Sequence, residues 1–264
     1  MNAKSDFFSE RQGVRVLGAF IDAMDWPEAL DTMQSWARMR VPRYICCCNA
    51  HSLITMRKES AVRDAIENAH LVLPDGAPVA WMMRRLGLRG QRRMSGPDLM
   101  WRYCARAECE GTSIFLYGNT DEVLRALQAR LLAAFPRLQI AGMLAPPFRP
   151  LTPAETGAVL ARIRKSGAGV AFISLGCPKQ ELWMAEQSAC LPAVMVGVGA
   201  AFDYHAGTLR RAPPWMQHAG LEWLHRLCTE PRRLWRRYLV TNLLFVFGAL
   251  GQLMHGGRGA AAGR

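Results

Sequence analysis

Residues 169–188 read GVAFISLGCPKQELWMAEQS, and this stretch decides the expected fold. The apolar run from Gly169 to Leu175 has the length and composition of a buried strand. A turn containing glycine and proline follows at Gly176, and a helical pattern begins at Gln180. The order of strand, glycine turn and helix is the repeating unit of an α/β protein.

The same alternation extends over most of the 264 residues. Apolar runs predict strands at 14–20, 44–48, 71–73, 113–117, 138–143, 169–175 and 193–198. Helical patterns lie between them, at 27–38, 60–69, 77–86, 97–107, 121–134, 153–165 and 180–188. We therefore expect an α/β, Rossmann-like fold with a mainly parallel sheet and flanking helices, in which ligands bind at the carboxyl ends of the strands.

The composition changes after residue 205, so we expect an α/β catalytic domain at 1–205, a basic helical appendage at 206–255 and a disordered tail at 256–264. From residue 206 onward the chain has nine arginines, no lysine and two acidic residues, hence a charge of +7 within a total of +12. Such a region can face nucleic acid, an anionic bilayer or a phosphorylated ligand, and a solubilising surface is the simpler alternative.

The segment Tyr238–Met254 carries no charge. It is somewhat shorter than the ~20 apolar residues of a membrane-spanning helix. On a helical wheel its polar and small residues fall on one side, which predicts an amphipathic helix lying in a membrane interface, with the preceding arginines at lipid headgroups. A helix packed on the protein core and a true membrane span are the alternatives. The polar and small residues on one side of this helical wheel are Thr241, Asn242, Gly248, Gly251 and Gln252.

The eight cysteines form no Cys-x-x-Cys pair, which argues against a zinc site. Cys46, Cys47 and Cys48 are consecutive in a predicted strand, so they point to alternating faces. The first ten residues lack the apolar run of a signal peptide. We therefore expect a cytoplasmic protein with free thiols.

Several polar residues follow predicted strands and are candidates for chemistry. Asp75 precedes a glycine, and an Asp-Gly pair is most often only a turn. At a strand end it is also a candidate general base, because a partly desolvated carboxylate has a raised pKa. Asn49 is a candidate ligand or helix cap. Arg93 lies just before a helix that begins with proline and has a surface residue beside the cap as its alternative, whereas the backbone N–H groups at Ser95 and Gly96 could hold a phosphate.

Two further groups lie near predicted strand ends. Gln180 and Glu181 open a helix after the strand at 169–175, and Glu181 has a structural role as its alternative. Gly199 belongs to a glycine pair that resembles half of a dinucleotide-binding fingerprint, a weak signal by itself. Asp203 could bind a nucleotide or cap a helix.

Three absences limit the function. The chain has no Gly-x-x-x-x-Gly-Lys-Ser/Thr sequence, which excludes a P-loop NTPase. The glycine fingerprint that a nicotinamide-dependent dehydrogenase carries after its first strand is missing. No Asp-x-Asp pair is present to hold a metal at a diphosphate, so arginines are expected to neutralise that group, with no metal and no cofactor.

The order of short motifs along the chain resembles the WecG/TagA/CpsF family of bacterial glycosyltransferases, from about residue 14 to about residue 240. These motifs are CCNA at 47–50, PDG at 74–76, RMSGPD at 93–98, GCPKQE at 176–181, GVGAAFD at 197–203, RRAPPW at 210–215, GLEWLHR at 220–226 and EPRRLWRR at 230–237.

The resemblance implies roles for single residues. Asp75 matches the family's proposed general base, and Asn49, Arg93 and Gln180 match residues near the substrate. Cys47 stands where the family usually has threonine, and thiols are weak hydrogen-bond donors. The appendage is implied to fold over the site and to bring arginines to the diphosphate or to lipid headgroups. The candidates for this task are Arg211, Arg226, Arg232 and Arg233.

The resemblance, together with the basic and apolar C-terminal region, implies an inverting glycosyltransferase on the inner face of the cytoplasmic membrane. It would move a hexosyl group from a UDP-sugar to a polyprenyl-diphosphate-linked saccharide in cell-envelope or extracellular polysaccharide synthesis. Cys47 and Cys177 are most similar to the GumM-like exopolysaccharide branch, which favours a neutral donor such as UDP-glucose over UDP-N-acetylmannosamine. The alternative is a non-catalytic membrane-surface or nucleic-acid binding protein. We do not expect nucleic acid as a partner. The resemblance also implies a tendency to self-associate.

Overall fold

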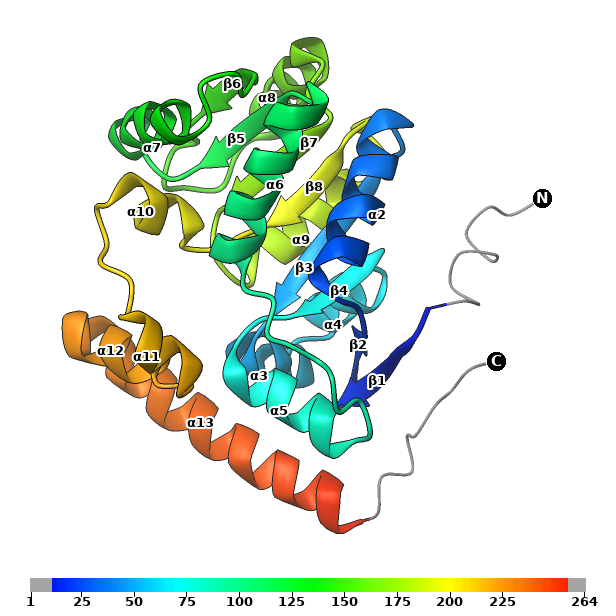
Figure 1. Ribbon diagram of the computed structural model, residues 1–264, viewed down its shortest axis with the longest axis vertical. Helices are drawn as coiled ribbons and strands as arrows, with labels where there is room; N and C mark the ends of the chain where they lie inside the picture. The colour runs from blue at the N-terminus through cyan, green and yellow to red at the C-terminus, as the bar shows by residue number, and fades with distance from the viewer. Residues whose placement is uncertain (1–10, 256–264) are drawn as a thin grey trace.

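The computed structural model describes residues 11–255 (Figure 1). It contains a six-stranded sheet with helices on both faces and a separate two-stranded sheet, followed by three C-terminal helices. The expected tail at 256–264 and the first ten residues lie outside the described range.

The large sheet has the strand order β4-β3-β8-β7-β5-β6, and all of its pairs are parallel. This arrangement confirms the predicted α/β fold. Because every strand runs the same way, the loops that follow the strands gather at one edge of the sheet. The strands are β3 (Arg43–Cys48), β4 (Leu71–Pro74), β5 (Ile114–Gly118), β6 (Ile140–Leu144), β7 (Val170–Ser174) and β8 (Val194–Gly197).

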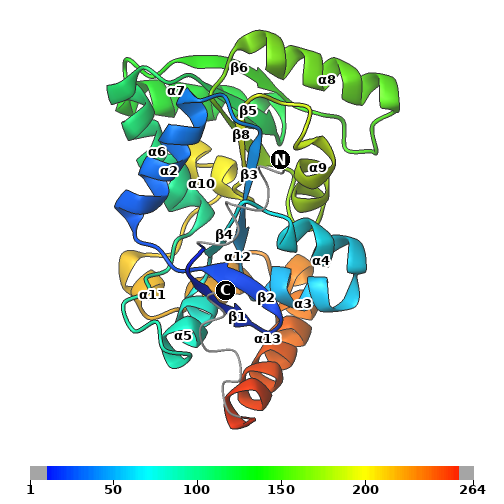
Figure 2. The ribbon, with the colours of Figure 1, turned by 90° about the vertical axis from the view of Figure 1, so that its right-hand side faces the viewer.

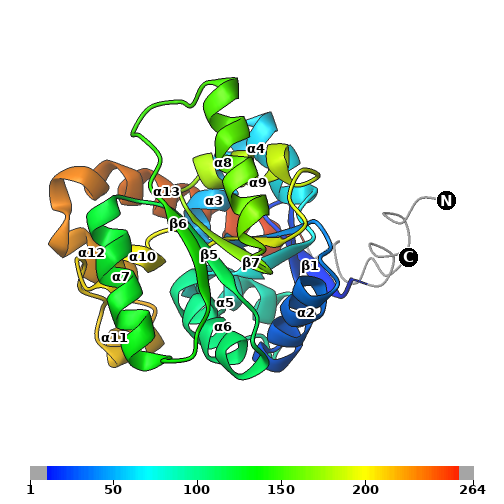
Figure 3. The same cartoon turned by 90° about the horizontal axis from the view of Figure 1, so that it is seen from above.

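Helices cover the two faces of this sheet, as the view from above shows (Figure 3). One face carries α2 (Trp26–Arg38), α6 (Gly96–Glu110), α7 (Asp121–Ala134) and α10 (Ala201–Ala206). The other carries α3 (Ala50–Lys58), α4 (Ser60–Glu67), α8 (Pro153–Ser166) and α9 (Lys179–Gln187). Side-chain caps begin several of these helices, at Asp25, Ser95, Thr120 and Thr152.

The cysteine-rich strand β3 lies in the interior of the sheet and is buried on both faces. Cys46 and Cys48 pack into the hydrophobic core on one face, and Cys47 packs into the core on the other. This confirms the alternation expected for adjacent residues of a strand. All three thiols are free.

The strand predicted at 14–20 is wrong, since this segment forms an antiparallel hairpin outside the large sheet. Its strands are β1 (Gly13–Val16) and β2 (Ala19–Asp22). Leu17 and Gly18 turn the chain with φ angles of 50° and 98°, the left-handed conformation of a two-residue hairpin turn. Leu17 is apolar and buried like Val16 and Ala19, so hydrophobicity alone does not mark the turn. The hairpin packs beside β4 and α5 (Ala77–Arg85).

The three C-terminal helices are α11 (Pro214–His218), α12 (Glu222–Thr229) and α13 (Pro231–Met254). The long helix α13 crosses the end of the molecule below the sheet and packs against α3 (Figures 1 and 2). Its Gln252 side chain accepts a hydrogen bond from Leu17 N at 2.9 Å and donates one to Arg15 O at 2.7 Å. The last turns of α13 are thereby fixed to the hairpin.

Helix α13 differs from an ordinary surface helix because its exposed side is apolar. Its inward side contains Thr241, which is buried, and Gln252, together with the buried Phe245. Its outward side is apolar and exposed, with Phe247 at 67% exposure. By length and composition alone, it is the one helix in the described part of the chain that could cross a membrane. The exposed apolar side consists of Trp235, Leu239, Val240, Leu243, Leu244, Val246, Phe247, Leu250 and Met254.

Candidate active site

A pocket of about 230 Å³ lies where the carboxyl ends of β3, β4, β7 and β8 meet the C-terminal helices. Most of the candidate residues from the sequence line it. The strand ends contribute Cys47, Asn49, Asp75 and Gly199 to its wall. Later elements contribute Arg93, Gln180, Glu181 and Arg226.

Asp75 directly follows β4 and is only partly exposed in this pocket. Its backbone N–H donates to Cys48 O at 2.9 Å, which fixes the residue at the end of β3. Burial raises the pKa of the Asp75 carboxyl to about 6, although the charge of Arg93 and a hydrogen bond from Asn49 lower it. Glu222 adds to the increase in this pKa. A carboxylate with a pKa near 6 is a suitable proton acceptor at neutral pH.

Asn49 serves both as a helix cap and as a neighbour of Asp75. Its Oδ1 atom accepts hydrogen bonds from His51 N at 3.0 Å and Ser52 N at 3.2 Å, and thereby begins α3. Its side chain also lies close enough to Asp75 to lower the pKa of that carboxyl group. The two interpretations of Asn49 are therefore compatible. Cys47 is nearly fully buried, and burial raises the pKa of its thiol.

Another wall of the pocket is the glycine loop, residues 198–200 directly after β8. Gln180 and Glu181 hold this loop in place. The Gln180 side chain accepts a hydrogen bond from Gly199 N at 3.1 Å and donates one to Glu181 Oε1 at 3.0 Å. Ser174 Oγ donates to Gly199 O at 2.7 Å, so both backbone groups of this glycine are fixed.

Glu181 is fully buried, and burial raises the pKa of its carboxyl group. Within the described part of the chain, its Oε2 atom has no hydrogen-bond partner. A protonated carboxyl group is the form that burial favours here, because an unpaired buried charge is costly.

The glycine loop also approaches α6 closely. A Cβ atom at Gly96 would lie 2.8 Å from Val198 O, so no larger residue fits at the start of this helix without a shift. This contact places Ser95 and Arg93, just before α6, beside the pocket.

The predicted arginines divide into three groups. Arg226 lines the pocket, whereas Arg211 lies behind it in a network of ion pairs. Arg233 is exposed and pairs with Glu230 at 2.8 Å, and Arg232 is exposed at the start of α13. These last two arginines face solvent rather than the pocket.

Arg237 departs from the expectation that it lies at lipid headgroups with its basic neighbours. It is partly buried and lines the pocket one turn before Thr241. Burial lowers the pKa of Arg237, and the nearby Arg226 lowers it further. No ion pair joins Arg237 to a carboxylate within residues 11–255. A buried guanidinium group without an acidic partner favours binding of an anion.

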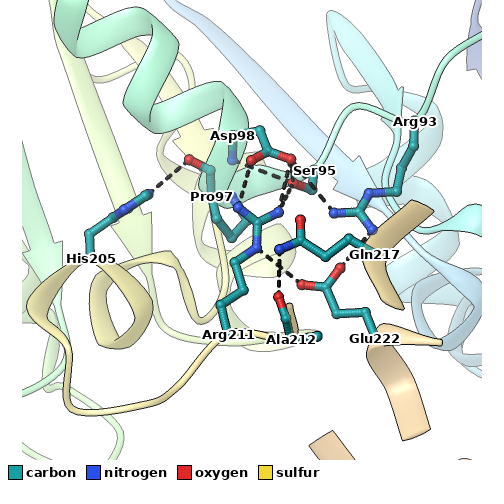
Figure 4. Close-up of polar contacts among 9 residues, drawn as sticks. All are labelled: Arg93, Ser95, Pro97, Asp98, His205, Arg211, Ala212, Gln217 and Glu222. Atoms are coloured by element: carbon teal, nitrogen blue, oxygen red, sulfur yellow. Dashed lines mark hydrogen bonds and ion pairs between the residues drawn. The ribbon is translucent and has the colours of Figure 1, made fainter. Parts of the chain in front are cut away.

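Four charged side chains connect the α/β body to the C-terminal helices (Figure 4). Arg211 binds Asp98 through Nη1–Oδ1 at 2.6 Å and Nη2–Oδ2 at 2.9 Å, and it contacts Glu222 Oε1 at 3.2 Å. Arg93 pairs with Glu222 Oε2 at 2.6 Å and with Asp98 at 3.6 Å. Burial by itself raises the pKa of Asp98, but hydrogen bonds from Arg211 and Ser95 and the two positive charges lower it to about 2.

Asp203 lies outside the residues that line the pocket. It follows β8 in α10 and accepts a hydrogen bond from Asn119 Nδ2 at 2.9 Å. Thr208 Oγ1 also donates to its carboxylate, at 3.4 Å. These contacts join α10 to the loop after β5. No group of three or more histidine, cysteine or acidic residues with metal-binding geometry occurs between residues 11 and 255.

Sequence reasoning missed part of the pocket. The side of the pocket that the C-terminal helices form includes Tyr238, Thr241 and Asn242 of α13 and Trp223 of α12. The signal was the helical spacing from Arg237 to Thr241 and from Tyr238 to Asn242, which places these residues on one face. His51 also lines the pocket, and burial with the charges of Arg237 and Lys58 lowers its pKa to about 4.

The parallel α/β fold places its pocket at the carboxyl ends of the strands, where ligands bind in folds of this kind. Comparison with known families gives the class. The profile of the glycosyl transferase WecG/TagA/CpsF family matches residues 14–259, nearly the whole chain. The chain therefore belongs to this family of glycosyltransferases, which acts in cell-envelope polysaccharide synthesis. The match concerns the family as a whole and gives no support for the GumM-like branch.

Proposed function

We propose that the protein is an inverting glycosyltransferase that moves a hexosyl group from a UDP-sugar to a polyprenyl-diphosphate-linked saccharide. Family membership implies a UDP-sugar donor and a lipid-linked acceptor. The observation that carries the reaction type is the desolvated carboxyl group of Asp75, with a pKa of about 6, in a pocket that also holds Arg93, Arg226 and Arg237.

The proposed step is a single displacement. Asp75 takes the proton of the acceptor hydroxyl group as that oxygen attacks the anomeric carbon of the donor. The bond between this carbon and the β-phosphate oxygen breaks, and UDP leaves with the electron pair. Attack from the opposite side inverts the anomeric centre. In this proposal Arg93, Arg226 and Arg237 neutralise the leaving diphosphate without a metal ion.

We also propose that the protein lies on the inner face of the cytoplasmic membrane. Self-association into a homo-oligomer is a separate part of the proposal. The outward side of α13 exposes a continuous apolar surface, and Arg232, Arg233 and Arg236 lie at its start. This combination is typical of a helix that lies in a bilayer interface with cations at the headgroups. A membrane location would bring the pocket to its lipid-linked acceptor.

The test is transfer by the purified protein from a panel of labelled UDP-sugars, including UDP-glucose and UDP-N-acetylmannosamine, to a polyprenyl-diphosphate saccharide. Each reaction is run with and without EDTA. We expect transfer of one sugar, unchanged by EDTA. Loss of transfer in EDTA would disprove metal independence. Absence of both transfer and UDP binding would favour the alternative, a non-catalytic binding protein, and vesicles or oligonucleotides would then identify its ligand.

A further inference from the structure

The four charged residues between the α/β body and the C-terminal helices are not equivalent. Arg93 and Glu222 line the pocket, whereas Arg211 and Asp98 lie behind it. Arg211 makes two hydrogen bonds with Asp98 and contacts Ser95 Oγ at 3.2 Å. Bidentate pairs of this kind are the strongest and most geometrically specific ion pairs of proteins. The pair behind the pocket is therefore the more strongly held of the two connections.

Arg93 is held differently. It makes one short contact, Nη1 to Glu222 Oε2 at 2.6 Å, and a longer contact of 3.6 Å with Asp98. The Arg93 side chain is only 15% exposed, so little water can solvate its charge. The carboxylate of Glu222 compensates that charge instead. Glu222 thus occupies the place of an anion beside a guanidinium group that faces the pocket.

We propose that Glu222 is a stand-in anion for Arg93, and that the donor's diphosphate displaces it when the donor binds. This proposal rests on the proposed function for the identity of the diphosphate. Before binding, Glu222 keeps Arg93 ordered and neutralised inside the pocket. During binding, the phosphate oxygens compete with the Glu222 carboxylate for Arg93. Glu222 then retains its 3.2 Å contact with Arg211, so α12 stays attached to the body.

This exchange makes Glu222 a positioning residue that reduces donor affinity. A carboxylate close to the phosphate site disfavours an anionic ligand, because like charges placed together repel. The ligand must also break the Arg93–Glu222 contact. Because only an anion can replace the Glu222 carboxylate at Arg93, the site selects an anionic ligand over a neutral one. The expected ligand at this position is a nucleoside diphosphate or inorganic diphosphate.

The test is calorimetric titration of UDP and of inorganic diphosphate into the full-length protein. Glu222→Gln keeps the side-chain size and removes the competing charge, so we expect both ligands to bind about three- to tenfold tighter. The matched control is Glu155→Gln, which removes the same charge from a surface ion pair with Arg149. The control should bind both ligands as the unaltered protein does. Thermal unfolding checks that each variant is folded.

The same titration in an Arg93→Gln background identifies the mechanism. If Glu222 acts through Arg93, the Glu222→Gln substitution tightens diphosphate binding less in that background than in the unaltered protein, because only its repulsion of the ligand remains to be removed. Equal tightening in both backgrounds would mean general charge repulsion, and weaker or unchanged binding in Glu222→Gln would mean that Glu222 only orders Arg93. Either result overturns the exchange.

The two probes also separate this inference from the proposed function. If the unaltered protein binds diphosphate with the expected pattern but does not bind UDP, the exchange at Arg93 stands and the UDP-sugar donor is wrong. If it binds neither ligand, both proposals fail. If it binds UDP but the substitutions have other effects, only the exchange fails.

Discussion

Arg211 and Asp98 form a bidentate ion pair between residues 113 positions apart in the sequence, and this pair joins the loop before α11 to α6 of the α/β body. Asp98→Asn removes the negative charge of the pair and should lower the free energy of unfolding by about 1–2 kcal/mol. This expected loss is smaller than that for a fully buried pair, because about a third of the Asp98 side chain is exposed. Denaturant unfolding at pH 7 measures this loss.

The pH dependence of the Asp98 contribution has a definite sign. Its pKa in the folded protein is about 2, below the ordinary value of aspartate near 3.9. The contribution is therefore complete above about pH 4 and is lost as the pH falls toward 2. The difference in stability between the unaltered protein and Asp98→Asn should shrink over that window, and a constant difference would contradict the assignment.

Asp75→Asn should abolish glycosyl transfer while UDP binding and folding are retained. The amide keeps the size of the side chain but cannot accept the proton, and loss of a general base costs about 10²- to 10⁴-fold in rate. Turnover with a saturating donor and calorimetric binding of UDP provide the measurement. Near-normal turnover by a folded variant would rule out Asp75 as the base.

The pKa of Asp75 also predicts a pH profile. Because a base acts in its ionised form, kcat/KM for the donor should rise with pH, with a half-point near 6, and should level off above about pH 7. The same raised pKa means that Asp75 lowers the stability of the fold as the pH rises from about 4 to 6, and that this loss is complete above about pH 6. Asp75→Asn should therefore unfold at a higher temperature than the unaltered protein at pH 8, and this advantage should diminish at pH 5.

Arg237 and Arg236 are adjacent arginines in different environments, so they form a matched pair. Arg237→Gln should lower kcat/KM about 10- to 100-fold, because it removes a cation from the pocket where the leaving diphosphate is proposed to lie. Arg236 stacks over the Trp235 ring at 5.3 Å on the exposed side. Arg236→Gln should have little effect with a water-soluble acceptor. Equal losses in both variants would contradict the proposed role of Arg237.

The outward side of α13 can be tested without disturbing its docking. Leu243 and Phe247 are 50% and 67% exposed, so the double variant Leu243→Ser and Phe247→Ser should fold normally and bind anionic vesicles more weakly. The matched control is Phe245→Ser, because Phe245 is 5% exposed and its replacement should lower stability instead. Unchanged cosedimentation of the double variant with vesicles would count against a membrane contact through α13.

The sequence was sufficient to predict the parallel sheet, because long apolar runs such as the one before Gly176 alternate with capped helices. It was also sufficient to place Asp75, Asn49 and Gln180 near one another, since parallel strands end at one edge of a sheet. The hairpin at Leu17 could not be predicted, because its turn contains a buried leucine instead of two polar turn residues. The helical spacing places Arg237 on the same face as Thr241 and away from Arg236, but which face of α13 enters the pocket depends on how the helix docks on α3.

The contact between Gln252 and the turn at Leu17 spans 235 residues and has a consequence for synthesis. At about 5–20 residues per second, the ribosome needs roughly 10–50 s to add the chain between these two positions. During that interval the first hairpin exists without its C-terminal partner, and the backbone groups of Arg15 and Leu17 that bind Gln252 remain open to solvent. The order of translation therefore makes the α/β body available before α13 can dock on it.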